Sequence, residues 1–125
     1  MVLESELIGH FLPEKLLEFF KIEKFEELGE VTIRKMCFYI YLEERNVIPI
    51  GYESSMYESK GFYPATTVQD FPIRGKSVYL IIKRRRWRHK ERKNEVISND
   101  YSLIAEGSKF TKELSDFLKA TGRYP

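Results

Sequence analysis

The chain has 125 residues, of which 42% are hydrophobic and 14% aromatic, and its 21 Lys and Arg nearly balance 19 Asp and Glu. This length fits one domain with a single core, and the composition argues against a largely disordered chain. No apolar run is long enough to span a bilayer, and no basic segment precedes an apolar stretch as in a signal peptide. The single cysteine, Cys37, excludes an internal disulfide. We therefore expect a cytoplasmic protein that has no membrane partner.

The first third of the chain predicts helices followed by a strand. Apolar residues recur at helical spacing across residues 3–11, and Pro13 suits the start of a second helical segment that reaches Phe20. Gly29 indicates a turn, after which alternation begins. Residues 36–42 then alternate as expected for a strand.

The middle of the chain predicts an irregular connection and then the strongest strand. Prolines and glycines are scattered over residues 44–64 and indicate a long loop. Residues 66–70 suit a short edge strand that ends in a turn at 71–75. Residues 77–87 then start as a continuous apolar run, which is typical of a strand covered on both faces, and continue as a run of cations.

The last third predicts a returning strand and a helix. Residues 89–94 form a polar tip, and residues 95–105 are expected to return antiparallel to the basic strand. Ser108 or Thr111 suits the N-cap of a final amphipathic helix that Gly122 ends. The predicted fold is a single α+β domain over residues 1–125. It has a mainly antiparallel sheet, a projecting basic β-hairpin, and helices at the N- and C-terminal ends.

Positive charge is concentrated in one window of the sequence. Residues 74–93 carry a net charge of +9, so the rest of the chain carries −7, and residues 1–30 alone carry −5. Blocks of one sign often bind a polyanion. An alternative is that the block is only a solvated hairpin tip.

The basic strand spaces its same-face side chains about 6.6 Å apart, a pitch that can follow a phosphate backbone. A two-stranded β-ribbon is also narrow enough to enter a major groove. Trp87 is expected either to stack on a base or to pack against the return strand. The predicted nucleic-acid-binding residues are Lys83, Arg84, Arg85, Arg86, Trp87, Arg88, Lys90, Arg92 and Lys93.

Catalytic and metal-binding patterns are missing from the sequence. His10 and His89 lie far apart, Cys37 lies within a strand, and no paired-ligand spacing, Gly-rich phosphate loop or G-x-S-x-G occurs. We therefore expect no metal, no cofactor, no small-molecule substrate and no catalytic residues in this chain.

Three segments together resemble one family. They are ESELIGHFLPEKLLEFF (residues 4–20), DFPIRGKSVYLIIKRRRW (70–87) and SLIAEGSKFTKELSDFLK (102–119). In this order they are similar to the N-terminal-region protein of ISAon-type bacterial insertion-sequence transposases. Single pieces of this kind are common, and it is their order that makes the resemblance specific.

The resemblance implies a small, non-catalytic accessory protein for transposition of a mobile element. Its partners would be double-stranded DNA, at the terminal inverted repeats, and a separate transposase subunit that holds the DDE catalytic triad. Related transposases often recognise their ends with a zinc ribbon and a helix-turn-helix. The knuckle cysteines of such a ribbon are missing here.

Two other functions fit a compact basic α+β domain. One is a small toxin-type ribonuclease, in which His89 and Tyr101 would be the acid–base candidates beside the arginines. The other is a protein-interaction module whose basic strand docks an acidic partner.

Overall fold

The computed structural model describes residues 10, 12, 16–30, 35–99, 101 and 111–122. Strands in this part are β1 (Phe20–Glu30), β2 (Lys35–Glu44), β3 (Tyr57–Phe62), β4 (Thr66–Ile73), β5 (Lys76–Lys83), β6 (Arg85–His89) and β7 (Val96–Ile97). The helical elements are α2 (Leu16–Phe19), the short η1 (Ser54–Met56) and α3 (Lys112–Ala120). None of these described helices combines the length and the apolar character needed to cross a membrane.

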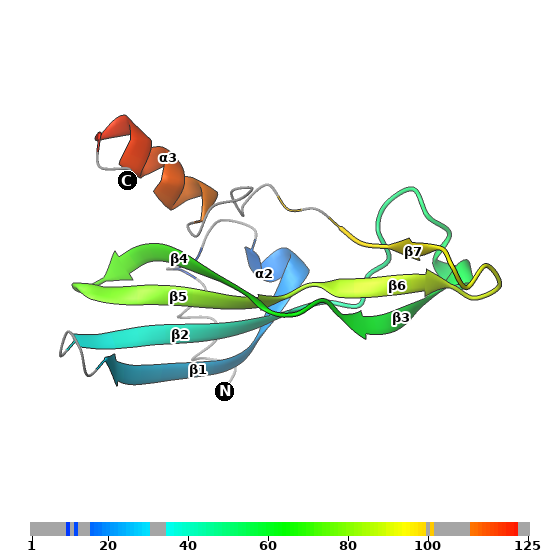
Figure 1. Ribbon diagram of the computed structural model, residues 1–125, viewed down its shortest axis with the longest axis horizontal. Coiled ribbons are helices and arrows are strands. Elements are labelled where there is room, and N and C mark those ends of the chain that lie inside the picture. The colour runs from blue at the N-terminus through cyan, green and yellow to red at the C-terminus, as the bar shows by residue number, and fades with distance from the viewer. Residues whose placement is uncertain are drawn as a thin grey trace.

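The strands form two sheets, a four-stranded sheet in the order β1-β2-β5-β4 and a three-stranded sheet in the order β3-β6-β7. Figure 1 shows the three-stranded sheet extending beyond the four-stranded one along the long axis of the molecule. All pairings among the described strands are antiparallel except the parallel pair β2–β5. The predicted α+β fold with a mainly antiparallel sheet and helices towards both ends is therefore confirmed.

One long hairpin, residues 57–89, links the two sheets. Its first arm is β3 and β4, its second arm is β5 and β6, and the Tyr63 amide donates to the Arg84 carbonyl (2.9 Å) between the two paired sections. Figure 1 shows both arms passing from one sheet to the other. We call this unit the long hairpin.

The basic strand is therefore not half of a two-stranded ribbon. Our expectation was that residues 95–105 would be its partner, but within the described residues only β7 returns beside it. β6 pairs with β3 on its other side, so it is the central strand of its sheet. A strand with two partners buries more of its surface than a ribbon does. The expected projecting hairpin is, in the structure, a projecting three-stranded sheet.

Left-handed backbone positions shape the long hairpin. Its turn has φ 54° at Arg74 and 79° at Gly75, the pattern of a type I′ turn, whose twist matches that of antiparallel strands. The register shifts between Ser59 and Phe62, where Gly61 has φ 81°, because one extra residue forms a bulge at this point. The Gly61 bulge lies where the first arm leaves one sheet for the other.

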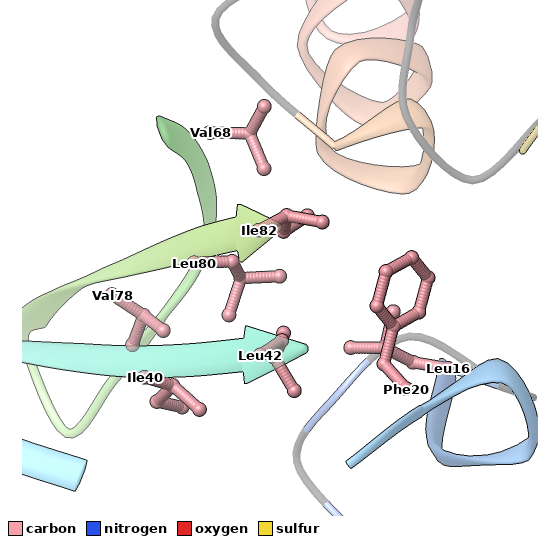
Figure 2. Close-up of a cluster of buried hydrophobic side chains, with 8 residues drawn as sticks. All are labelled: Leu16, Phe20, Ile40, Leu42, Val68, Val78, Leu80 and Ile82. Carbon is pink, nitrogen blue, oxygen red and sulfur yellow. The ribbon is translucent and has the colours of Figure 1, made fainter. Parts of the chain in front are cut away.

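The larger core covers one face of the four-stranded sheet. Its buried side chains are Leu16, Phe20, Ile40, Leu42, Val68, Val78, Leu80 and Ile82. Figure 2 shows Leu16 and Phe20 facing the ends of β2 and β5. The continuous apolar run predicted a strand covered completely on both faces. Instead β5 alternates, with Leu80 fully buried and its neighbours Tyr79 and Ile81 half-buried.

A second core lies under the three-stranded sheet. Trp87 is completely buried there, together with Tyr57 and Ile97. Ile48 and Met56, from the connection between β2 and β3, pack against this cluster. The segment predicted as an irregular loop, residues 44–64, thus contains η1 and β3 and supplies part of a core.

Helix α3 is attached to the edge of the four-stranded sheet through Thr111. Its hydroxyl accepts from the Leu114 amide (3.3 Å), which confirms the predicted N-cap, and donates to the buried Asp70 carboxylate (2.9 Å). Burial raises the pKa of Asp70 above its ordinary value, and the hydrogen bonds from Phe71 and Thr111 offset part of this effect. Gly122 has φ 71°, as expected after a helix end.

Other sequence predictions were wrong or fall outside the described residues. The second predicted helix was expected to reach Phe20, but the described helix α2 ends at Phe19, because Phe20 already begins β1, which pairs with β2. Apart from residue 10, the predicted helix over residues 3–11 lies outside the described part of the chain, as does the alternative cap at Ser108.

Candidate nucleic-acid interface

The nine predicted nucleic-acid-binding residues occupy three different places in the structure. Arg86 and Arg88 lie on the outer face of the three-stranded sheet, and Arg84 lies just before β6, over the same Tyr63 ring as Arg86. Lys90, Arg92 and Lys93 lie in the tip that joins β6 to β7. Lys83, Arg85 and Trp87 lie at the junction of the sheets or in the second core.

The outer face is set by strand alternation. Because successive side chains point to opposite faces of a strand, burial of Trp87 and His89 places Arg86 and Arg88 on the other side. The Arg84 and Arg86 guanidinium carbons lie 5.4 and 5.6 Å from the centre of the same ring, that of Tyr63. Both guanidinium groups are therefore within cation–π distance of one aromatic ring, and positive charge combined with aromatic rings is what surfaces for single-stranded nucleic acid use.

Within the described part of the chain, the Glu58 carboxylate contacts two of these cations. The Glu58 side chain contacts both Arg88 Nη2 and Lys93 Nζ at 3.5 Å. The nearby Lys93 charge, followed by hydrogen bonds from Lys93 and Arg88, lowers the pKa of Glu58 below its ordinary value. We call the surface formed by Arg84, Arg86, Arg88 and Lys93 around Tyr63 and Glu58 the cationic face.

Two donors on the cationic face lack acceptors. The Nε atoms of Arg86 and Arg88 are buried and make no hydrogen bond within the described residues. Arg86 uses Nη2 to donate to the Lys60 carbonyl (3.3 Å), and Arg88 uses Nη2 towards Glu58. A buried donor without a partner costs about 1–3 kcal/mol, so the described contacts do not satisfy these two side chains.

The tip is held in shape by His89. Its Nδ1 accepts from the amides of Glu91 (3.1 Å) and Arg92 (2.9 Å), and its side chain is buried. Tyr57 donates to Glu95, whose carboxylate also contacts Arg92 Nε at 3.1 Å. The pKa of Glu95 is lowered by these hydrogen bonds, from Tyr57 first and Arg92 second. His89 therefore shapes the tip, and its ring is not at the surface.

The remaining predicted residues have structural contacts. Trp87 is fully buried, and its indole nitrogen donates to Asn46 Oδ1 (2.8 Å), so it packs within the domain and presents no face to a base. Lys83, at the end of β5, contacts Glu23 of the edge strand β1 at 3.5 Å. Arg85 donates from Nη1 to Ser59 Oγ (2.6 Å) and lies over the Phe62 ring at 4.5 Å.

Glu44 joins the two sheets. This buried carboxylate, at the end of β2, accepts from the Arg85 amide (2.8 Å), from Asn99 Nδ2 (3.2 Å) and from the Tyr101 hydroxyl. Burial, and then the hydrogen bond to Glu44, raises the pKa of Tyr101 far above its ordinary value. These contacts fix where β6 begins.

Sequence reasoning missed Glu58 and Tyr63. Both lie in or beside β3, which was predicted as an irregular connection, so their place next to the arginines depends on a pairing that the sequence did not indicate. Within the described residues, no three His, Cys, Asp or Glu side chains are grouped so that they can hold a metal ion.

Comparison with known proteins gave no relative. No protein-family model, no curated protein and no solved structure matches this chain.

Proposed function

We propose that this protein is a non-catalytic DNA-binding subunit of a split insertion-sequence transposase. The cationic face contacts phosphates near the ends of the element, and a separate subunit with the DDE triad supplies catalysis. The DNA-binding part of the proposal is supported by the geometry. The transposase part is supported by the resemblance of residues 4–20, 70–87 and 102–119.

One observation carries the DNA-binding proposal, namely that Arg84 and Arg86 lie over the same Tyr63 ring and that Arg88 shares the outer side of β6 with Arg86. Guanidinium groups are the preferred donors to phosphate oxygens. Like charges placed side by side cost free energy, and a bound polyanion removes that cost. Lys90, Arg92 and Lys93 in the adjoining tip add attraction that does not depend on sequence.

The test is a titration of a fluorescent duplex that carries the inverted repeats flanking the gene, at two salt concentrations. We expect affinity to fall steeply with salt, because each neutralised phosphate releases counterions. Replacing Arg84, Arg86 and Arg88 with Gln should weaken binding by at least about 30-fold and flatten the salt slope by about 0.9 for each lost phosphate contact.

A matched control removes the same charge from the other sheet. Lys21, Lys24 and Lys76 each contact a carboxylate on the four-stranded sheet, so their triple Gln variant changes the net charge equally, away from the cationic face. If both triple variants bind duplex DNA alike, or if the wild-type protein does not bind, the proposal is wrong.

Binding to an acidic protein without affinity for DNA would favour the protein-interaction module. A scrambled duplex reports sequence preference.

The contacts of the described residues favour DNA binding over the ribonuclease alternative. His89 lies at one end of β6, and Tyr101 contacts Glu44, which binds Arg85 at the other end. At strand rise this separates the two groups by about 13 Å. Both ring systems are also engaged, His89 with the tip amides and Tyr101 with Phe19 and Phe20.

A further inference from the structure

We infer that Arg86 and Arg88 form a phosphate subsite in which a guanidinium binds a nucleic-acid phosphodiester side-on, that is, through Nε and one terminal nitrogen. Glu58 occupies part of this subsite when no nucleic acid is bound. The inference rests on the proposed function, because it specifies how the cationic face binds its ligand. It assigns Glu58 the role of an internal competitor that sets affinity.

The unpaired Nε atoms support the side-on geometry. A guanidinium binds phosphate with two parallel hydrogen bonds either through its two terminal nitrogens or through Nε and one terminal nitrogen. In Arg86 and Arg88 a terminal nitrogen already has a partner, while Nε has none among the residues that the structure describes. A phosphate oxygen is the acceptor that these two donors lack. Because both Nε atoms are buried, each guanidinium has to turn outwards before it can bind in this way.

The position of Glu58 supports competition. Its carboxylate contacts Arg88 and Lys93 from the same outer face, so it neutralises two of the cations that a phosphate would use. Turning Arg88 outwards breaks its 3.5 Å contact with Glu58. The Glu58 side chain is 42% exposed, so it can move into solvent once it is displaced. Binding therefore exchanges an internal carboxylate for a phosphate.

Glu58→Gln tests the competition directly, with the same duplex titration. We expect binding to tighten about three- to tenfold, and the salt slope to steepen by about 0.9 because Lys93 or Arg88 gains a phosphate contact. Glu27→Gln is the matched control, since Glu27 pairs with Lys76 in the four-stranded sheet and the charge change is the same. Its effect should stay within about 1.5-fold, because exposed charges beyond a Debye length are screened.

The charge-conserving pair Arg86→Lys with Arg88→Lys tests the side-on geometry. Lysine keeps the charge but cannot form two parallel hydrogen bonds, so binding should weaken about tenfold. Arg74→Lys makes the same change of residue type in the β4–β5 turn, away from the cationic face, and should leave binding unchanged. The inference is overturned if wild-type protein binds DNA but Glu58→Gln acts no more strongly than Glu27→Gln, or if the Arg86→Lys and Arg88→Lys pair binds as tightly as Arg74→Lys. If wild-type protein does not bind DNA, the proposed function itself has failed.

Discussion

The two ends of the long hairpin bury their apolar side chains in different ways. In β5 three aliphatic residues, Val78, Leu80 and Ile82, share the buried face with side chains from neighbouring strands. In β6 one residue, Trp87, fills most of the smaller core with help from Tyr57 and Ile97. One large buried aromatic side chain stabilises a three-stranded sheet, so the opposite face of that sheet is free to carry arginines.

The substitution with the largest expected effect on this comparison is Trp87→Ala. Truncating a buried tryptophan costs about 3–5 kcal/mol, and here it also leaves Asn46 without its donor. We expect the amides of β6 to exchange with solvent much faster in this variant, while those of β2 and β5 keep more protection. Hydrogen exchange measured by mass spectrometry reports both regions in one experiment.

Leu80→Ala is the counterpart in the larger core, with a cost of about 2–5 kcal/mol. It should raise the exchange rate across both sheets, because the four-stranded sheet supports the arms of the long hairpin. Equal loss of protection in both sheets after Trp87→Ala would show that the molecule unfolds as one unit, and the comparison would then not hold.

Glu44→Ala tests the contact between the two regions. The substitution leaves the Arg85 amide, Asn99 and Tyr101 without their acceptor, so we expect a loss of about 2–3 kcal/mol in the free energy of unfolding in urea. The neighbouring Glu43→Ala removes a contact with the exposed Lys21 and should cost about 0–1 kcal/mol. Similar losses in the two variants would contradict the joining role of Glu44.

Gly61→Ala tests the bulge at which the first arm changes sheets. Space around Gly61 is open, but its φ of 81° strains any residue that has a side chain. The expected loss is about 1 kcal/mol in a thermal or urea unfolding experiment. Lys60→Ala, at the adjacent exposed position, should stay within about 0.5 kcal/mol.

Asp70→Asn has the smallest expected effect and concerns the edge of the four-stranded sheet alone. The folded state holds the pKa of Asp70 above its ordinary value of 3.8, so ionisation opposes folding. Wild-type stability therefore falls as pH rises from 3.8 through the folded pKa, and the asparagine variant lacks this decline. Unfolding curves at pH 3 and pH 7 should show similar stability at the lower pH and a more stable variant at the higher one. If the variant were instead less stable than wild type at pH 7, another titrating group would control the pH dependence of stability.

Local patterns predicted part of the fold well. Residues 36–42, the edge strand after Thr66 and the cap at Thr111 were recovered, because alternation and capping depend on neighbours in sequence. β1 was missed, because its strand state comes from pairing with β2. β3 was missed as well, since a glycine bulge interrupts its alternation.

In the candidate site, too, local patterns were predicted and long-range contacts were not. The charge count located the arginines, and strand parity placed Arg84, Arg86 and Arg88 on one side of the predicted strand. The sequence did not distinguish these three from Arg85, because the inward role of Arg85 depends on Ser59 and Phe62 in the other arm of the long hairpin. For Trp87 the sequence left both base stacking and packing against the return strand open, because its burial depends on residues 46–57.

The Arg74–Gly75 turn also bears on how the chain folds. Hairpins close from their turn within about 1–10 μs, and pairing spreads outwards from residues that are close in sequence. We expect β4 and β5 to pair first, and the arginine-bearing end, which lies farthest from the turn, to close last. The parallel pairing of β2 with β5 closes a longer loop and follows more slowly. The surface that we propose for nucleic acid thus assembles late.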